Sequence, residues 1–240
     1  MNATTFPSDD YTPIFNNKST RSAFIGKVFS IVQAQLLFTA AAVIVMQNIG
    51  IFSRLAEYLL LPAAIVGIGS ALALTFSRSL ARTTPHNYIL LGAFTLAESI
   101  LVNSTLSVYS LETISHAFFA TALLVGAVYV AAKKSNFDIT NSRFFTYVAM
   151  FHLAVVLLSA FIMRIDQILM AYVGALMFCA YLYFDLQLLM GDRAKAVSID
   201  DYIFASINIY VDIVGLFVKL VQIFGEQERK KKEQEQRRRR

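Results

Sequence analysis

The sequence carries little charge: Asp, Glu, Lys and Arg make up 15% of its 240 residues, whereas 57% are hydrophobic. A soluble domain has about 25% charged residues, which cover its surface. The single cysteine, Cys179, excludes a disulfide framework and a cysteine-based zinc site. Four prolines and ten glycines are too few for a Pro/Gly-rich low-complexity domain. An ordinary soluble enzyme is therefore excluded, and we expect no cofactor.

Long apolar runs are abundant instead. A helix needs roughly 20 apolar residues to cross the ~30 Å hydrocarbon core of a bilayer. Seven runs approach that length: 28–46, 58–76, 88–108, 117–132, 144–163, 168–190 and 202–224. Lipid offers no partners to backbone amides, so the unbroken runs must be helices. The sequence thus predicts an all-α membrane bundle of seven helices, with a polar segment at 1–27, the bundle at 28–224 and a basic tail at 225–240.

Lys and Arg are unevenly distributed between the two sides that these runs define, and they concentrate on the cytosolic side of membrane proteins. The segments that alternate with the N-terminus hold ten, whereas the opposite segments, without the tail, hold only Arg54 and Arg164. The N-terminus is therefore expected in the cytosol. The tail holds eight more Lys and Arg residues, which also favour the cytosolic side. Seven crossings, however, put the tail on the side opposite to the N-terminus. Either one run, most naturally the last and most polar, is re-entrant or buried without crossing cleanly, or one of these rules is overridden.

The last run has a polar stripe on an otherwise apolar helix. At 100° per residue, six of its polar or small residues fall within about 80° of one another. They are Asp201, Asn208, Asp212, Gly215, Lys219 and Gln222. Such a stripe must face protein or water, because a charge at the bilayer centre costs a few kcal/mol or more. We therefore expect this helix at the centre of the bundle.

Three acids lie within the spans: Glu98, Asp185 and Asp212. Ionisable residues at membrane depth usually belong to ion or proton pathways, and the alternative is a hydrogen-bonded role in holding helices together. Asn208 lies one turn from Asp212 and is expected to brace it through a hydrogen bond. Lys219 lies two turns beyond Asp212 and is expected to extend its ammonium toward the membrane surface rather than to pair with Asp212.

Four motifs resemble those of one known family. They are 94–98 (FTLAE), 181–187 (YLYFDLQ), 201–203 (DYI) and 208–217 (NIYVDIVGLF). On these motifs and the seven-run layout over residues 20–225, the chain is similar to the Bax inhibitor-1 family. Its short N-terminus and its tail of Lys, Arg and Glu resemble the Bax inhibitor-1 branch more than the Lifeguard branch.

The resemblance implies a calcium leak in the endoplasmic reticulum membrane that is gated by pH and suppresses cell death, with Bcl-2 family proteins as candidate partners. It also implies that Asp185 and Asp212 form a paired pH sensor. An arginine at the end of the second helix is their alternative partner. Arg78 or Arg82 fits that position, and Arg78 is preferred because it lies nearer the span.

Two buried carboxyl groups within hydrogen-bond reach cannot both ionise cheaply, so the pair is expected to hold one shared proton as a clamp. Loss of the proton leaves two anions that repel, or that capture an arginine or a calcium ion. Calcium prefers several oxygen ligands, which Asp185, Asp212, Asn208 and Glu98 supply in part. We therefore expect calcium to pass along the stripe of the last helix, with the two aspartates as gate and metal ligands.

Two other classes of membrane protein are alternatives to a calcium leak. An intramembrane aspartyl protease also needs two aspartates, but it carries Gly-x-Gly-Asp and a Pro-Ala-Leu turn, which are missing here, so no enzyme is expected. The substantive alternative is a membrane protein that regulates death-pathway partners without conducting ions. The tail is expected to be a solvated helix or a disordered extension that attracts anionic lipid, and nucleic-acid binding is not expected.

Overall fold

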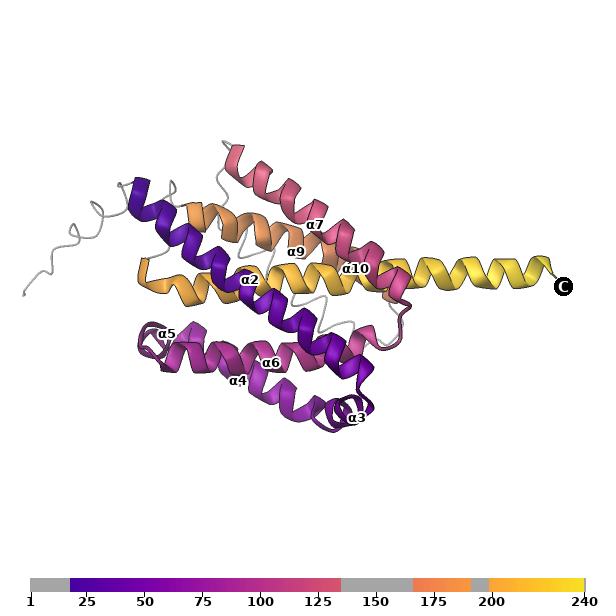
Figure 1. Cartoon of the computed structure of the whole chain (residues 1–240). Helices are drawn as coiled ribbons and strands as arrows, with labels where there is room; N and C mark the ends of the chain where they lie inside the picture. The colour runs from indigo at the N-terminus through magenta and orange to yellow at the C-terminus, as the bar shows by residue number, and fades with distance from the viewer. Residues whose placement is uncertain (1–17, 135–165, 191–198, 240) are drawn as a thin grey trace, which may run out of the picture.

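The computed structural model describes residues 18–134, 166–190 and 199–239, and these ranges form helices that pack side by side (Figure 1). The helices are α2 (Lys18–Asn48), α3 (Gly50–Tyr58), α4 (Leu60–Phe76), α5 (Arg78–Arg82), α6 (His86–Leu106), α7 (Leu111–Lys134), α9 (Gln167–Met190) and α10 (Tyr202–Arg238), with the short 3₁₀-helix η1 (Ile199–Asp201) before α10. The expected run at 144–163 lies outside the described residues.

Five of these helices, α2, α6, α7, α9 and α10, are long and apolar enough to cross a membrane. The bent pair α3 and α4 adds a sixth crossing if the two count as one span. The prediction of an all-helical membrane bundle is therefore confirmed for the described residues. The count of seven is not, because the described ranges supply five or six.

The second predicted span, 58–76, is interrupted at its start. Helices α3 and α4 meet at Leu59 with a bend of 65°. Pro62 contributes to this break: it has no N–H to donate to the carbonyl of Tyr58, so a straight helix across this point would lose a hydrogen bond. In the observed structure Pro62 lies in the first turn of α4, where a helix tolerates proline.

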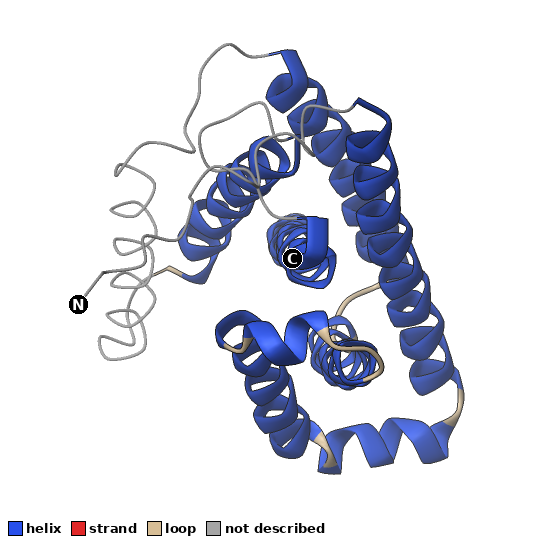
Figure 2. Ribbon diagram, turned by 90° about the vertical axis from the view of Figure 1, so that its left-hand side faces the viewer, coloured by secondary structure: helices blue, strands red, loops and turns tan. Residues whose placement is uncertain are grey.

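Helix α10 is the central helix, as the polar stripe predicts. It packs against α9, α7, α2, α6 and α4, and the view in Figure 2 shows it surrounded by the other helices. Its side chains at Ile203, Ile209 and Tyr210 are at most 1% exposed. α10 is one continuous helix over 37 residues, which favours a full crossing, and whether the last run spans or is re-entrant stays a prediction. Burial against neighbouring helices accommodates its polar residues.

The two ends of α10 lie at opposite ends of the bundle. At its start, the ring of Tyr202 lies 3.3 Å from the ammonium of Lys27, near the start of α2. Glu228 contacts Thr113 at the start of α7, about 39 Å farther along α10 at 1.5 Å per residue. The start of α2 and the extension of α10 are thus on opposite sides, which conflicts with the preference of the charges for two cytosolic ends. Which side faces the cytosol stays a prediction.

Candidate functional site

Helices α9 and α10 run antiparallel in close contact, and two glycines set their spacing. The ring of Phe178 packs on Gly215, where a Cβ would lie 2.3 Å from Cζ. The stem of Lys219 packs on Gly174, where a Cβ would lie 2.9 Å from Cε. Small residues let membrane helices approach closely, and this contact brings side chains from distant parts of the sequence together.

The same register places Asp185 of α9 beside Asp212 of α10, close enough for their carboxyl groups to interact. Asp212 is only 5% exposed, and Asp185 is half-buried. In the described part of the chain, the Oδ2 atom of Asp212 has no hydrogen-bond partner. A buried carboxylate oxygen without a partner is costly, so this pair is a candidate site for a proton or a cation.

A cavity of about 330 Å³ adjoins the two aspartates. Asn208, one turn before Asp212 on α10, lines it together with Thr75 of α4. The structure therefore brings together Asp185, Asp212 and Asn208, three of the residues that the sequence singled out. Among the described residues, no three His, Cys, Asp or Glu are grouped to hold a metal ion. Calcium binding by the two aspartates thus stays a prediction.

Glu98 lies in a second cavity of about 250 Å³, between α6, α9 and α10. Lys219 and Phe178 line this cavity too, and Val211 lines both cavities. Glu98 is therefore next to the aspartate site but not part of it. Lys219 donates a hydrogen bond to the side-chain oxygen of Gln222 at 3.2 Å. Its ammonium thus binds a residue farther from Asp212 along the helix, and its extension to the membrane surface stays a prediction.

Arg82 has a different partner from the one expected. Its guanidinium binds the carboxylate of Asp201 through two hydrogen bonds, from Nε to Oδ1 at 2.8 Å and from Nη2 to Oδ2 at 3.0 Å. Asp201 precedes Asp212 by eleven residues, about 16 Å along a helix. Arg82 thus joins α5 to the start of α10. The side chain of Arg78, the preferred candidate, lies outside the described part of the structure.

A buried network of hydroxyl groups joins α2, α6 and α10, and the sequence reasoning missed it. Thr39 and the hydroxyl of Tyr210 share a hydrogen bond of 2.7 Å, and Ser99 donates to Thr39 at 3.2 Å. Gln35 donates to Thr95 at 2.9 Å. The spacing held a signal, because 35 and 39 lie one turn apart on α2, as do 95 and 99 on α6. Polar residues repeated at that spacing in a span commonly connect helices.

The extension of α10 is anchored where it leaves the bundle, a second feature that sequence reasoning missed. The carboxylate of Glu228 accepts hydrogen bonds from Thr113 and from Ser110, whose hydroxyl in turn caps α7. Lys232 donates to the same carboxylate at 2.5 Å. Lys232, Thr113 and Ser110 together lower the pKa of Glu228 to about 2.

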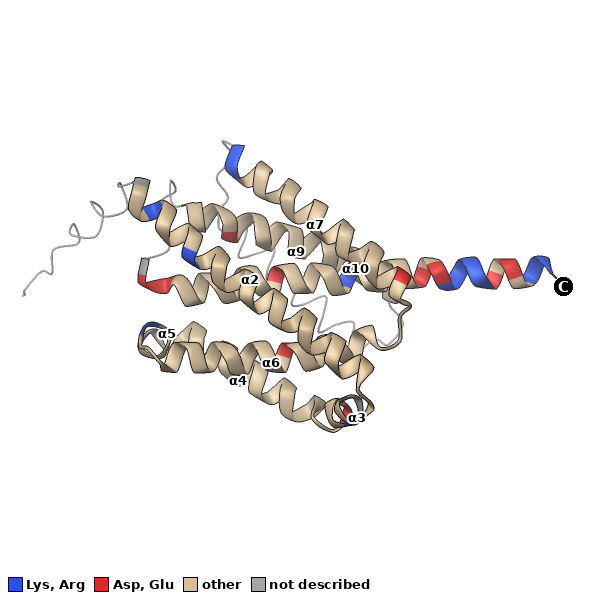
Figure 3. Cartoon of the chain, viewed as in Figure 1, with Lys and Arg blue, Asp and Glu red and all other residues tan. Residues whose placement is uncertain are grey.

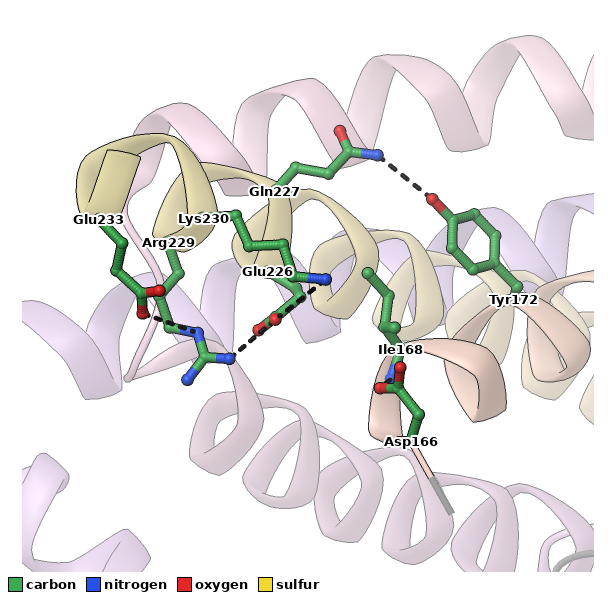
Figure 4. Close-up of polar contacts among 8 residues, drawn as sticks. All are labelled: Asp166, Ile168, Tyr172, Glu226, Gln227, Arg229, Lys230 and Glu233. Atoms are coloured by element: carbon green, nitrogen blue, oxygen red, sulfur yellow. Dashed lines mark hydrogen bonds and ion pairs between the residues drawn. The ribbon is translucent and has the colours of Figure 1, made fainter. Parts of the chain in front are cut away.

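On the α9 side of the extension, Gln227 donates to the hydroxyl of Tyr172 at 3.3 Å (Figure 4). Glu226 accepts from Arg229 at 2.8 Å and lies 3.7 Å from the ammonium of Lys230. Charged residues are sparse within the bundle and gather on this extension (Figure 3). The tail is thus a helix through Arg238, which agrees with the expected solvated helix and not with the expected disordered extension. The base of this helix is attached to the bundle.

In the described residues, an all-helical bundle of membrane-capable helices surrounds a central helix, and that helix and its neighbour α9 each contribute one acid to a pair; this defines an integral membrane protein. The family profile described as "Inhibitor of apoptosis-promoting Bax1" matches residues 21–229. The chain therefore belongs to the Bax inhibitor family, a family of anti-apoptotic membrane proteins, and the resemblance drawn from the sequence is confirmed.

Several curated proteins are similar over most of their length. Protein lifeguard 4 of Mus musculus is 32% identical over 215 residues, which cover 88% of this chain and 87% of that protein. The Golgi anti-apoptotic protein of vaccinia virus (strain Lister) is 31% identical over 217 residues, 88% of each chain. Protein lifeguard 3 of Homo sapiens is 26% identical over 230 residues, 92% of this chain and 74% of that protein. The expected closer likeness to the Bax inhibitor-1 branch stays a prediction.

Proposed function

We propose that this protein is a calcium leak pathway of an intracellular membrane, the endoplasmic reticulum, and that protons open and close it. The observation that carries the proposal is the pair of Asp185 and Asp212 beside a cavity on the central helix. By draining stored calcium, the protein limits cell death. The name of the vaccinia virus relative, an anti-apoptotic protein, supports this last step.

A shared proton is the basis of the gate. Two carboxyl groups at hydrogen-bond distance in a poorly hydrated site titrate as one unit, and they hold one proton between them at a lower cost than two negative charges. With that proton bound, the hydrogen bond between Asp185 and Asp212 clamps α9 to α10. Without it, the two carboxylates repel, and the pair becomes a site for a cation.

Calcium suits the deprotonated pair, because it binds oxygen ligands in flexible arrangements. The side-chain carbonyl of Asn208, on the same cavity, adds a neutral oxygen to the two carboxylates. In the open state an arginine competes with calcium for the aspartates. We assign this part to Arg78, since Arg82 is held by Asp201.

Calcium flux into liposomes tests the proposal. Wild-type protein is reconstituted with a trapped calcium indicator, and Asp185→Asn and Asp212→Asn are compared with Asp166→Asn as the matched control. Asp166 lies outside the spans and caps α9 by accepting the N–H of Ile168 at 3.0 Å, which Asn also does. We expect the wild type and the control to carry calcium with the same pH response, and the other two variants to lose that response. Wild-type liposomes no leakier than empty ones would contradict the proposal.

The second candidate function is that of a non-conducting membrane protein that regulates partners of the death pathway, including Bcl-2 family proteins. The helical extension favours it, because residues 229–238 carry exposed charge beyond the bundle. Basic residues next to a span also attract anionic lipid, at about 1 kcal/mol each near the surface. Under this candidate, deletion of residues 229–240 abolishes protection of cells from death, whereas the two Asp→Asn variants keep it.

A further inference from the structure

The two cavities along α10 share one lining residue. The aspartate cavity is lined by α10 residues from Ile207 to Asp212, and the Glu98 cavity by α10 residues from Val211 to Lys219, with Val211 common to both. Together they extend along about 18 Å of the helix at 1.5 Å per residue, more than half of the ~30 Å hydrocarbon core. An ion that follows the polar stripe past the aspartates therefore next enters the cavity that holds Glu98 and Lys219.

Lys219 is built into that second cavity. Its aliphatic stem passes over Gly174 of α9, where any larger residue would collide with Cδ and Cε. Its ammonium is held by the side-chain oxygen of Gln222 at 3.2 Å. Glu98 is on the facing helix α6 and lines the same cavity. The cavity is thus lined by one basic and one acidic side chain, and the lysine is on the central helix itself.

A fixed ammonium acts on passing cations in proportion to their charge. Coulomb energy scales with the product of the two charges, and it is larger away from bulk water. A divalent ion therefore meets twice the repulsion of a monovalent ion at the same position. If Lys219 lowers the occupancy of a monovalent ion by some factor, it lowers that of a divalent ion by the square of the factor.

We propose that Lys219 is the residue that sets the selectivity between divalent and monovalent cations, by opposing the passage of calcium through the Glu98 cavity. The inference rests on the proposed function, because it concerns the rate and selectivity of the same pathway. It assigns Lys219 a part separate from that of the aspartate pair: the pair responds to protons, and the lysine keeps the leak slow.

The single cysteine of the chain permits a test within one folded protein. In a Cys179→Ser background, Lys219→Cys places a unique thiol in the cavity. Reaction of its thiolate with 2-aminoethyl methanethiosulfonate attaches an ammonium through a disulfide bond, whereas methyl methanethiosulfonate attaches a neutral group. Calcium and potassium fluxes are measured in liposomes before and after each reagent, with Lys219→Arg as the variant that keeps the charge and Cys179→Ser alone as the reagent control.

We expect the unreacted Lys219→Cys protein to pass more calcium than the Cys179→Ser control. Its increase for calcium should be about the square of its increase for potassium. The aminoethyl reagent should restore the slow calcium flux, the methyl reagent should not, and Lys219→Arg should match the wild type. High salt should narrow the difference, since mobile ions screen the fixed charge.

Two outcomes would overturn the inference. In the first, calcium flux is the same with and without a charge at position 219. In the second, calcium and potassium rise by equal factors, as expected from a cavity that is merely wider. The proposed function fails separately: wild-type protein then carries no calcium at any pH. If the wild type conducts calcium but the aminoethyl group at position 219 has no effect, the proposed function stands and only the role of Lys219 is contradicted.

Discussion

The ring of Phe178 lies directly on Gly215, at a distance where a Cβ on residue 215 would be 2.3 Å from Cζ and 2.4 Å from Cε1. Phe178 is two turns before Asp185 on α9, and Gly215 is just under one turn after Asp212 on α10. The contact therefore fixes the spacing of the two helices next to the aspartate pair. A close packing contact in this structure positions a pair of acids.

Gly215→Ala is expected to push α9 away from α10, because the ring of Phe178 has no room for the added methyl. Overpacking of this kind costs about 1–3 kcal/mol in unfolding free energy, and the aspartate hydrogen bond should weaken with it. Gly69→Ala on α4 is the control, since a Cβ there meets nothing within 4 Å. Thermal unfolding in detergent measures both. Equal stability of the two variants would contradict the contact.

Tyr210→Phe is expected to lower the unfolding free energy by about 1 kcal/mol, the usual size of a hydrogen bond between membrane helices. The change leaves the hydroxyl of Thr39 without its partner on α10 in a site that is shielded from water. Tyr58→Phe is the matched control, because Tyr58 is 82% exposed. The same unfolding measurement compares them, and a control that is destabilised as much as Tyr210→Phe would count against the network.

Arg82 and Asp201 form a pair that is 35% and 23% exposed, so its stabilising effect is expected to be small. A double-mutant cycle with Arg82→Gln and Asp201→Asn should give a coupling energy of about 0.2–1 kcal/mol, the range of exposed ion pairs. The exchanged pair, Arg82→Asp with Asp201→Arg, should recover most of it. A coupling energy of zero would show that α5 is attached to α10 by other contacts.

Glu228 is expected to keep its contacts throughout the physiological pH range. Lys232, Thr113 and Ser110 lower its pKa to about 2, from an ordinary value near 4.3. A carboxyl group whose pKa is lowered by folding stabilises the folded protein fully at pH values above its ordinary pKa. This stabilisation is lost as the pH falls through the lowered pKa. The protection factor for hydrogen exchange at Thr113, which corrects for the intrinsic pH dependence of exchange, should therefore be unchanged from pH 8 to pH 5. Glu228→Gln should lower that protection factor at every pH.

This prediction also separates two sources of pH dependence. If the extension of α10 detached between pH 8 and pH 5, Glu228 would be a pH sensor in its own right. The lowered pKa argues that it is not, so a pH response in that range comes from a group other than Glu228.

The sequence was enough to predict the long helices among the described residues and the central position of α10, because apolar runs and a one-sided polar stripe are local patterns. It also singled out Asp185, Asp212 and Glu98, since acids are rare in spans. It did not predict that Glu98 lies in its own cavity or that Arg82 pairs with Asp201. Those depend on how helices rotate and slide against one another.

Two further features were hidden for a physical reason. The contact of Phe178 with Gly215 needs the register of α9 against α10, which a single sequence does not contain. The anchor of Glu228 on Ser110 and Thr113 joins segments more than 110 residues apart. By composition the tail is an ordinary run of solvated charged residues. Glu228 differs from the other acids of the tail only because the start of α7 lies beside it and donates hydrogen bonds to it.

The central claim is that Asp185 and Asp212 act as one proton-sensitive unit, and the flux of calcium against pH tests it most directly. Wild type, each Asp→Asn variant and the double variant are measured in liposomes from pH 5 to pH 8. The account predicts that the wild type slows as the pH falls. It also predicts that the double variant has no pH response and that each single variant loses as much of the response as the double. Single variants whose losses add independently, or a double variant with the wild-type profile, would contradict it.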